Sequence, residues 1–152
     1  MPVSAKIPES YVKSENSRLQ LYKQIFSAED EDTLIALRSQ VHDRYGALPE
    51  ESKLLFHVAM LKQKLAAIGV VRFASGRKGL VEMQFGNVTA MNKSKVDRLL
   101  EAIANNANLY QIAPDNRVML KVEVPQGLKI HDQYLVIKEL NQAIEPLVLA
   151  IS

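Results

Sequence analysis

The spacing of hydrophobic and polar positions changes near the middle of the chain. Between Ser14 and Ile68, apolar side chains recur every three or four residues, which places them on one face of an α-helix. From Val70 to Phe85 they tend to alternate with polar side chains, as in a β-strand with one buried face. The pattern predicts a helical first half and a sheet that begins near Val70.

Three helices are predicted in the first half, after an extended lead-in over residues 1–10. The first begins near Ser14 and ends near Ser27. The second ends at Gly46, and Pro49 starts the third. The inward-facing residues are expected to be Leu19, Tyr22, Ile25 and Phe26 in the first helix, Leu34, Leu37, Val41 and Tyr45 in the second, and Leu54, Leu55, Val58, Leu61, Leu65 and Ile68 in the third.

Two hairpins are predicted in the second half. Strands over 70–75 and 80–85 are joined by a four-residue loop, and strands over 109–113 and 117–124 by a turn at 114–116. Inward strand residues are expected to be Val81, Met83 and Phe85 in the first hairpin and Val118, Leu120, Val122 and Val124 in the second.

A helix is expected after each hairpin. The first is capped by Asn92 and runs to about Asn105, and the second runs from about Asp132 until Pro146 breaks it. Their inward residues are expected to be Val96, Leu99, Leu100 and Ile103, and then Val136, Leu140 and Ile144. The order of elements predicts an α+β fold with N-terminal helices and a mainly antiparallel four-stranded sheet backed by helices.

Length and composition favour one globular domain over residues 1–152, with an apolar tail over 147–152 that packs on the body or on a neighbour. The chain has no cysteine, which excludes disulfides, thiol catalysis and zinc sites with sulfur ligands. The start of the sequence lacks the basic and apolar regions of a signal peptide. We therefore expect a soluble cytoplasmic protein.

The sequence offers little material for catalysis. It contains no phosphate-binding glycine loop and no nucleophile elbow, and His42, His57 and His131 have no metal-ligand spacing. The acidic run at 29–32 is explained by the positive end of the helix that follows it. We expect no catalytic residue, no metal site and no cofactor, and neither binding nor hydrolysis of ATP.

Charge is unevenly distributed, which leaves a second hypothesis open. Residues 62–98 carry eight basic and two acidic side chains, whereas acidic residues outnumber basic ones on both sides. A nucleic-acid-binding module would use this segment for phosphate contacts that weaken steeply with salt. The candidate phosphate contacts are Arg77, Lys78, Lys93, Lys95 and Arg98. Gel-shift titration at two salt concentrations separates this hypothesis from a protein-binding function.

Two segments carry family information. IPESYVKSENSRLQLYKQI matches an I/L-P-x-x-Y/F-I/V…R-L-x-x-Y-K-x-I pattern, and HDRYGALPEESKLL contains the D-R-F/Y-G-x-L-P pattern downstream. Together they resemble the C-terminal domain of the bacterial transcription-repair coupling factors, the Mfd family. The resemblance extends through the hairpin at 70–85, and beyond about Asn92 it rests on the order of elements.

The resemblance implies a non-catalytic, autoinhibitory piece of a much larger protein. In that family the parent is an ATP-dependent DNA translocase that engages RNA polymerase, and its N-terminal UvrB-like module binds the repair protein UvrA. The C-terminal domain lies against this module and masks the UvrA-binding surface until polymerase is engaged. The implied partner is thus a module of the same polypeptide, with an indirect effect on UvrA and no role for a membrane.

The family's contact residues match Asp43 and Arg44, together with Gln40. Helical geometry gives separate support: at about 100° per residue, Asp43 points directly away from the apolar face, and Arg44 and Gln40 project from the adjoining flank. The family can have a glutamate at the position of Gln40, so a salt bridge there becomes a neutral hydrogen bond in this chain.

Overall fold

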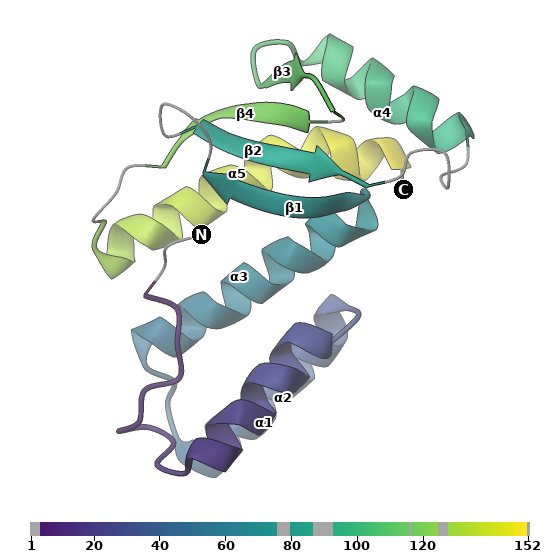
Figure 1. The fold of residues 1–152 in the computed structure, drawn as a ribbon. Helices are drawn as coiled ribbons and strands as arrows, with labels where there is room; N and C mark the ends of the chain where they lie inside the picture. Colours follow the sequence, from purple (N-terminus) through teal and green to yellow (C-terminus); the bar gives the residue numbers. More distant parts are fainter. Residues whose placement is uncertain (1–3, 76–79, 87–92, 116, 125–127, 152) are drawn as a thin grey trace. The chain divides into compact units, whose positions relative to one another are not determined.

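The fold is α+β, as the sequence predicts. The computed structural model describes residues 4–75, 80–86, 93–115, 117–124 and 128–151, and within them the predicted order of three helices, hairpin, helix, hairpin and helix is confirmed (Figure 1). The elements are α1 (Glu15–Ser27), α2 (Glu31–Tyr45), α3 (Glu50–Ala67), β1 (Val70–Ser75), β2 (Leu80–Phe85), α4 (Lys93–Asn105), β3 (Tyr110–Ala113), β4 (Arg117–Glu123) and α5 (Ile130–Ile151).

The chain divides into two compact units. One, the helical unit, comprises residues 3–63 and 129–134, and the other, the sheet unit, comprises residues 1–2, 64–128 and 135–152. The division falls within α3 and within α5. Each unit is described separately below.

The N-terminal helices of the helical unit begin and end on the signals that the sequence contains. The Ser14 side chain caps α1 by accepting from the Ser17 N–H, and an Asp30 Oδ1 accepts from the Thr33 N–H at 2.7 Å to cap α2. Hydrogen bonds with the side chain and the backbone of Thr33 lower the pKa of Asp30. Gly46, with φ of 89°, ends α2 and donates to the His42 carbonyl at 2.8 Å.

The buried face of α1 differs from the predicted one. Leu21 and Ile25 are buried, whereas Leu19 and Phe26 are 52% and 46% exposed, so the prediction was wrong for these two residues. Leu21 and Ile25 share a core cluster with Ile7 and Val12 of the lead-in, and Tyr22 packs at its edge, where its hydroxyl accepts from the Ile7 N–H at 2.7 Å. Tertiary contacts thus override the apolar stripe read from α1 alone.

Helix α3 is buried more broadly than a single stripe. All the inward residues predicted for it are buried, which confirms that prediction, but Phe56 and Ala59 are buried too. Leu55, Phe56 and Ala59 belong to the hydrophobic core of the helical unit together with Leu34, Leu37 and Val41 of α2. An apolar surface this wide is typical of a central helix.

The sheet unit contains an antiparallel sheet with strand order β1-β2-β4-β3. Val81, Met83 and Phe85 are buried, as predicted, and so are Val118, Leu120 and Val122, whereas Val124 is half-buried. Glu82 and Arg117, across the β2–β4 pair, form an ion pair at 3.3 Å. Asp115 adopts a φ of 63° in the turn between β3 and β4. The predicted loop at 76–79 lies outside the described residues.

The prediction for helix α4 is correct in the extent of the helix, but only partly correct in the residues that it buries. Leu99 and Ile103 are buried and Val96 is half-buried, whereas Leu100 is 52% exposed, so its predicted inward position was wrong. Residues 99 and 103 lie four apart and share a face, and Leu100 is turned about 100° from Leu99. The predicted cap, Asn92, lies outside the described residues.

Helix α5 does not stop where the sequence predicted. It continues through Pro146 to Ile151, and Leu147 is completely buried. Proline cannot donate a backbone hydrogen bond and crowds the carbonyl four residues earlier. Here the buried hydroxyl of Tyr110 donates to the neighbouring Ala143 carbonyl, while burial of Leu147 stabilises the last turns. None of the helices in the described part of the chain is long and apolar enough to cross a membrane.

Replacing Tyr110 by phenylalanine is expected to destabilise the sheet unit. Tyr110 is 3% exposed, and burial raises its pKa to about 12, so its hydroxyl is a neutral donor at pH 7. Loss of the bond to Ala143 leaves a buried carbonyl acceptor with one partner fewer, which costs about 1–3 kcal/mol. Urea denaturation of both proteins measures the loss, and an unchanged free energy of unfolding would contradict this role of the hydroxyl.

Candidate functional site

The two sequence motifs meet at the end of α2. Tyr11, from the first motif, donates its hydroxyl to the Gly46 carbonyl at 2.7 Å, and its ring lies 5.9 Å from that of Tyr45. Arg18, also from the first motif, donates to the Val12 carbonyl at 2.7 Å. These bonds fix the lead-in against the C-terminal end of α2, so they also fix the orientation of the polar residues in its last turns.

The predicted interface residues are exposed on α2. Asp43 faces away from the buried Leu37 and Val41, whereas Gln40 and Arg44 are exposed on the flank beside these two residues. The side chain of Asp43 is 85% exposed. The guanidinium carbon of Arg44 lies 5.4 Å from the centroid of the Tyr45 ring, a cation–π distance that restrains the arginine. The exposure expected from helical geometry is therefore observed, and none of the three is a core residue.

Gln40 and Arg44 line a hollow between α1 and α2. It measures about 210 Å³, and we call it the glutamine hollow. Its polar lining residues from α1 are Ser17, Gln20 and Gln24. The sequence analysis missed these three, although their spacing of three and four residues places them on one face of a helix. The hollow offers amide donors and acceptors beside one guanidinium, a surface suited to hydrogen bonding with a polar partner.

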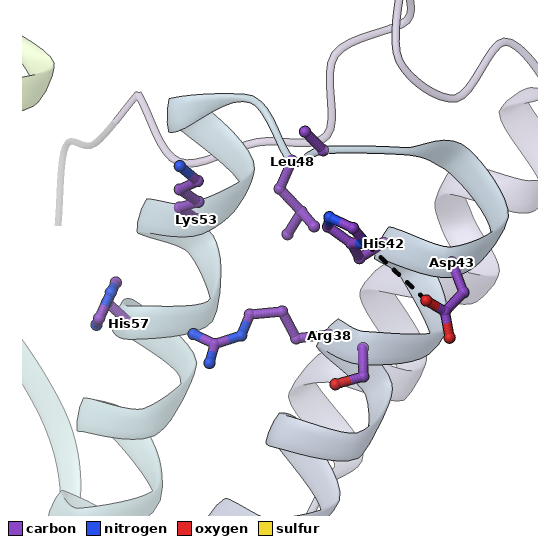
Figure 2. Close-up of a pocket in the computed structure, with 8 residues that line it drawn as sticks. Arg38, His42, Asp43, Leu48, Lys53 and His57 are labelled. Atoms are coloured by element: carbon purple, nitrogen blue, oxygen red, sulfur yellow. Dashed lines mark ion pairs between the residues drawn. The ribbon is translucent and has the colours of Figure 1, made fainter.

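Asp43 lines a different hollow, between α2 and α3. This one measures about 390 Å³, and we call it the basic hollow (Figure 2). Its charged or titratable lining residues are Arg38, His42, Asp43, Lys53 and His57. The Nδ1 of His42 lies 3.9 Å from an Oδ1 of Asp43 at the edge of the hollow. The predicted patch is thus divided, with Asp43 on one side and Gln40 and Arg44 on the other.

His57 is held at the α3 side of the basic hollow. Its ring makes an edge-to-face contact with Tyr134, with 5.3 Å between centroids, and the Tyr134 hydroxyl donates to the Glu50 carbonyl at 3.4 Å. Burial lowers the pKa of His57, and the positive charge of Arg38 lowers it further. The imidazole is therefore neutral at pH 7 and available as both donor and acceptor.

Replacing Arg38 by glutamine is expected to raise the pKa of His57, because the guanidinium disfavours the protonated ring. The pKa should stay below the usual value for histidine, since the effect of burial remains. NMR titration of the His57 ring protons measures it. Lys53→Gln is the matched control: Lys53 lines the same hollow but pairs with Glu50 at 3.2 Å. Equal pKa values in the wild type and Arg38→Gln would contradict the electrostatic coupling.

The candidate phosphate contacts do not form one described surface. Lys93, Lys95 and Arg98 are exposed on α4, and Arg98 donates its Nε–H to the Ser94 carbonyl of its own helix. Lys95 and Arg98 are neighbours on that helix, but Lys93 is turned more than about 120° from both. Arg77 and Lys78 lie outside the described residues. The nucleic-acid hypothesis stays a prediction.

The histidines are divided between two places. His42 and His57 both line the basic hollow, and His131 is exposed in the first turn of α5. Over the residues that the structure describes, no group of three or more histidine, cysteine, aspartate or glutamate side chains is arranged to hold a metal ion.

Comparison with known proteins shows consistent similarity to one family. The family model described as TRCF domain matches residues 1–96. The transcription-repair-coupling factors of Haemophilus influenzae and Escherichia coli K12 are 31% and 30% identical over 99 and 95 residues, which is 65% and 62% of this chain. That of Myxococcus xanthus is 28% identical over 132 residues, or 87% of this chain.

The chain spans only a small part of these relatives, from 8% to 10% of their length. A solved structure described as the crystal structure of the C-terminal domain of transcription-repair coupling factor matches 99% of this chain and 90% of its own. The TM-score is 0.72 at 20% identity, so this similarity concerns the fold. It extends the match beyond the residues covered by the family model, through the second hairpin and α5.

Proposed function

Because the chain belongs to the TRCF domain family, we propose that residues 1–152 form the C-terminal regulatory domain of a transcription-repair coupling factor. On this proposal the domain is non-catalytic. It binds the N-terminal UvrB-like module of the same polypeptide and masks the surface with which that module binds UvrA. The parent protein hydrolyses ATP, moves along DNA and engages RNA polymerase through other parts of its chain.

The observation that supports the proposal is the exposure of Asp43 and Arg44 at the end of α2. Both side chains lie outside the hydrophobic core, at a helix end whose orientation is fixed by the Tyr11–Gly46 bond. Opposite charges exposed at one helix end are suited to a specific polar contact with a complementary surface. Gln40 and the α1 residues of the glutamine hollow extend this surface with neutral hydrogen-bonding groups.

A weak contact suffices for such regulation. Two surfaces on one polypeptide meet at an effective concentration in the millimolar range when the linker permits it. A contact of modest intrinsic affinity is then formed most of the time, and it can still dissociate when the parent engages polymerase. A coupling free energy of about 1–3 kcal/mol corresponds to a change of roughly 5- to 150-fold in UvrA affinity.

Calorimetric titration of this chain into the separately produced N-terminal module tests the proposal. A one-to-one complex is expected, with an affinity that falls as salt rises because the contact involves charges. The double variant Lys138→Ala/Glu139→Ala is the matched control, since it removes one exposed positive and one exposed negative charge from α5. It should bind like the wild type. Absence of a complex at a millimolar concentration of this chain would contradict the proposal.

A further inference from the structure

Arg38, a half-buried residue of the basic hollow, has no ionic partner among the described residues. Arg38 lies on α2 and its side chain extends towards α3, on the side where His57 lies (Figure 2). Among the residues that the structure describes, none forms a hydrogen bond or an ion pair with this guanidinium. Lys53 pairs with Glu50 at 3.2 Å, and Asp43, at the edge of the hollow, lies 3.9 Å from His42. Arg38 is thus the cation of the hollow for which no partner is described.

We propose that the basic hollow binds one carboxylate side chain, an aspartate or a glutamate, of a protein partner. The planar guanidinium of Arg38 presents paired N–H groups that match the two oxygens of a carboxylate. The His57 ring, held in place by Tyr134, adds a donor beside it. If the proposed function holds, on which this step rests, the carboxylate belongs to the N-terminal module. The basic hollow then adds a second contact with that module, next to the one made by Asp43.

The charges of the hollow favour a carboxylate over a nucleic-acid phosphate. A nucleic acid is held by several cations that follow its backbone, whereas this hollow has a single unmatched one. The carboxylate of Asp43 lies on its edge and would repel the neighbouring phosphates of a strand. The excess of basic residues in the chain lies between residues 62 and 98, outside the hollow.

The occupied hollow is expected to respond to pH. His57 is faced by Arg38 from α2 and by the Tyr134 ring from α5, with Lys53 on its own helix and the negative Glu50 near Tyr134. A carboxylate bound to Arg38 offsets the positive charge and favours the protonated ring. Binding therefore takes up a proton, and it strengthens as the pH falls from about 7.5 to about 5.5.

NMR titration of the 152-residue chain tests the proposal without the partner. The probe is N-acetyl-glutamate N-methylamide, the control ligand is its glutamine counterpart, and inorganic phosphate forms a third arm. The glutamate probe is expected to shift the Arg38 Nε–H and His57 ring signals in a saturable way and to raise the pKa of His57. The glutamine ligand should do neither, and Arg38→Gln should lose the response of His57, whereas Lys138→Gln should retain it.

Three results would overturn the proposal: no saturable response to the glutamate probe, equal responses to both amino-acid ligands, or a full response of His57 in Arg38→Gln. Tighter binding of phosphate than of glutamate would contradict the carboxylate assignment. Arg38→Lys, which retains the charge without the planar fork, should show a weakened response. Because the titration uses this chain alone, a failure here is distinct from a failure to bind the N-terminal module.

Discussion

Replacing Leu61 by alanine is expected to lower the free energy of unfolding by roughly 2–5 kcal/mol. Leu61 is 1% exposed on α3, and Leu54, Val58 and Leu65 of the same stripe are buried as well. Truncation removes buried methyl groups and leaves a cavity that close-packed neighbours fill only in part. Urea denaturation followed by circular dichroism measures the loss, provided that the transition is cooperative.

The matched control for this prediction is Leu19→Ala on α1. Leu19 undergoes the same chemical change at a site that is 52% exposed, so its effect should stay within about 0.5 kcal/mol. A loss for Leu61 as small as that for Leu19 would show that the α3 stripe contributes little to the core. Comparable large losses at both sites would contradict the solvent-exposed position of Leu19.

The sequence predicted those elements whose burial follows from local spacing. Leu34, Leu37 and Val41 recur at helical intervals on α2 and are buried, and Val81, Met83 and Phe85 alternate along β2 and are buried. The C-terminal end of α2 was predicted equally well, since Gly46 is the residue type that helix ends prefer. In these segments local propensity and tertiary burial agree, so the pattern alone is sufficient.

The sequence failed where a distant contact decided the outcome. Phe26 is exposed, and the Lys62 ammonium of α3 lies 4.9 Å from its ring centroid, a contact that no local pattern predicts. Helix α5 continues through Pro146, next to which Leu147 is buried and Tyr110, from β3, donates to the Ala143 carbonyl. Both errors arise from residues far apart in the chain.

The candidate site divides in the same way. Exposure of Asp43 and Arg44 followed from the helical geometry of α2, and the structure agrees. The two hollows were not predicted, because each needs a second helix: α1 supplies Gln20 and Gln24, and α3 supplies His57. A helical pattern indicates which side of one helix is polar, but it does not indicate which other segment lies beside it.

Substituting Asp43 and Arg44 together by alanine is expected to change stability by less than about 1 kcal/mol, because exposed charges contribute little to folding. In the full-length parent the same change removes charged groups from the proposed intramolecular contact. UvrA affinity should then rise about fivefold or more. The melting curve of this chain and the UvrA affinity of the full-length variant are the two measurements.

The control for the double variant is again Lys138→Ala/Glu139→Ala, which should change neither quantity. Strong destabilisation by the Asp43 and Arg44 substitutions would mean that these residues are structural. An unchanged UvrA affinity with intact folding would mean that the regulatory contact lies on another surface. Adding Arg38→Gln to the double variant shows, through any further rise in UvrA affinity, whether the basic hollow contributes to the same contact.

Competition between this chain and UvrA for the N-terminal module tests the central claim most directly. The module is held with UvrA, the 152-residue chain is added up to millimolar concentration to match the effective concentration of a linked domain, and bound UvrA is measured. Masking predicts that bound UvrA falls progressively as the chain is added, and that the Asp43 and Arg44 double variant displaces less. A ternary complex in which the module holds both UvrA and this chain would contradict the account.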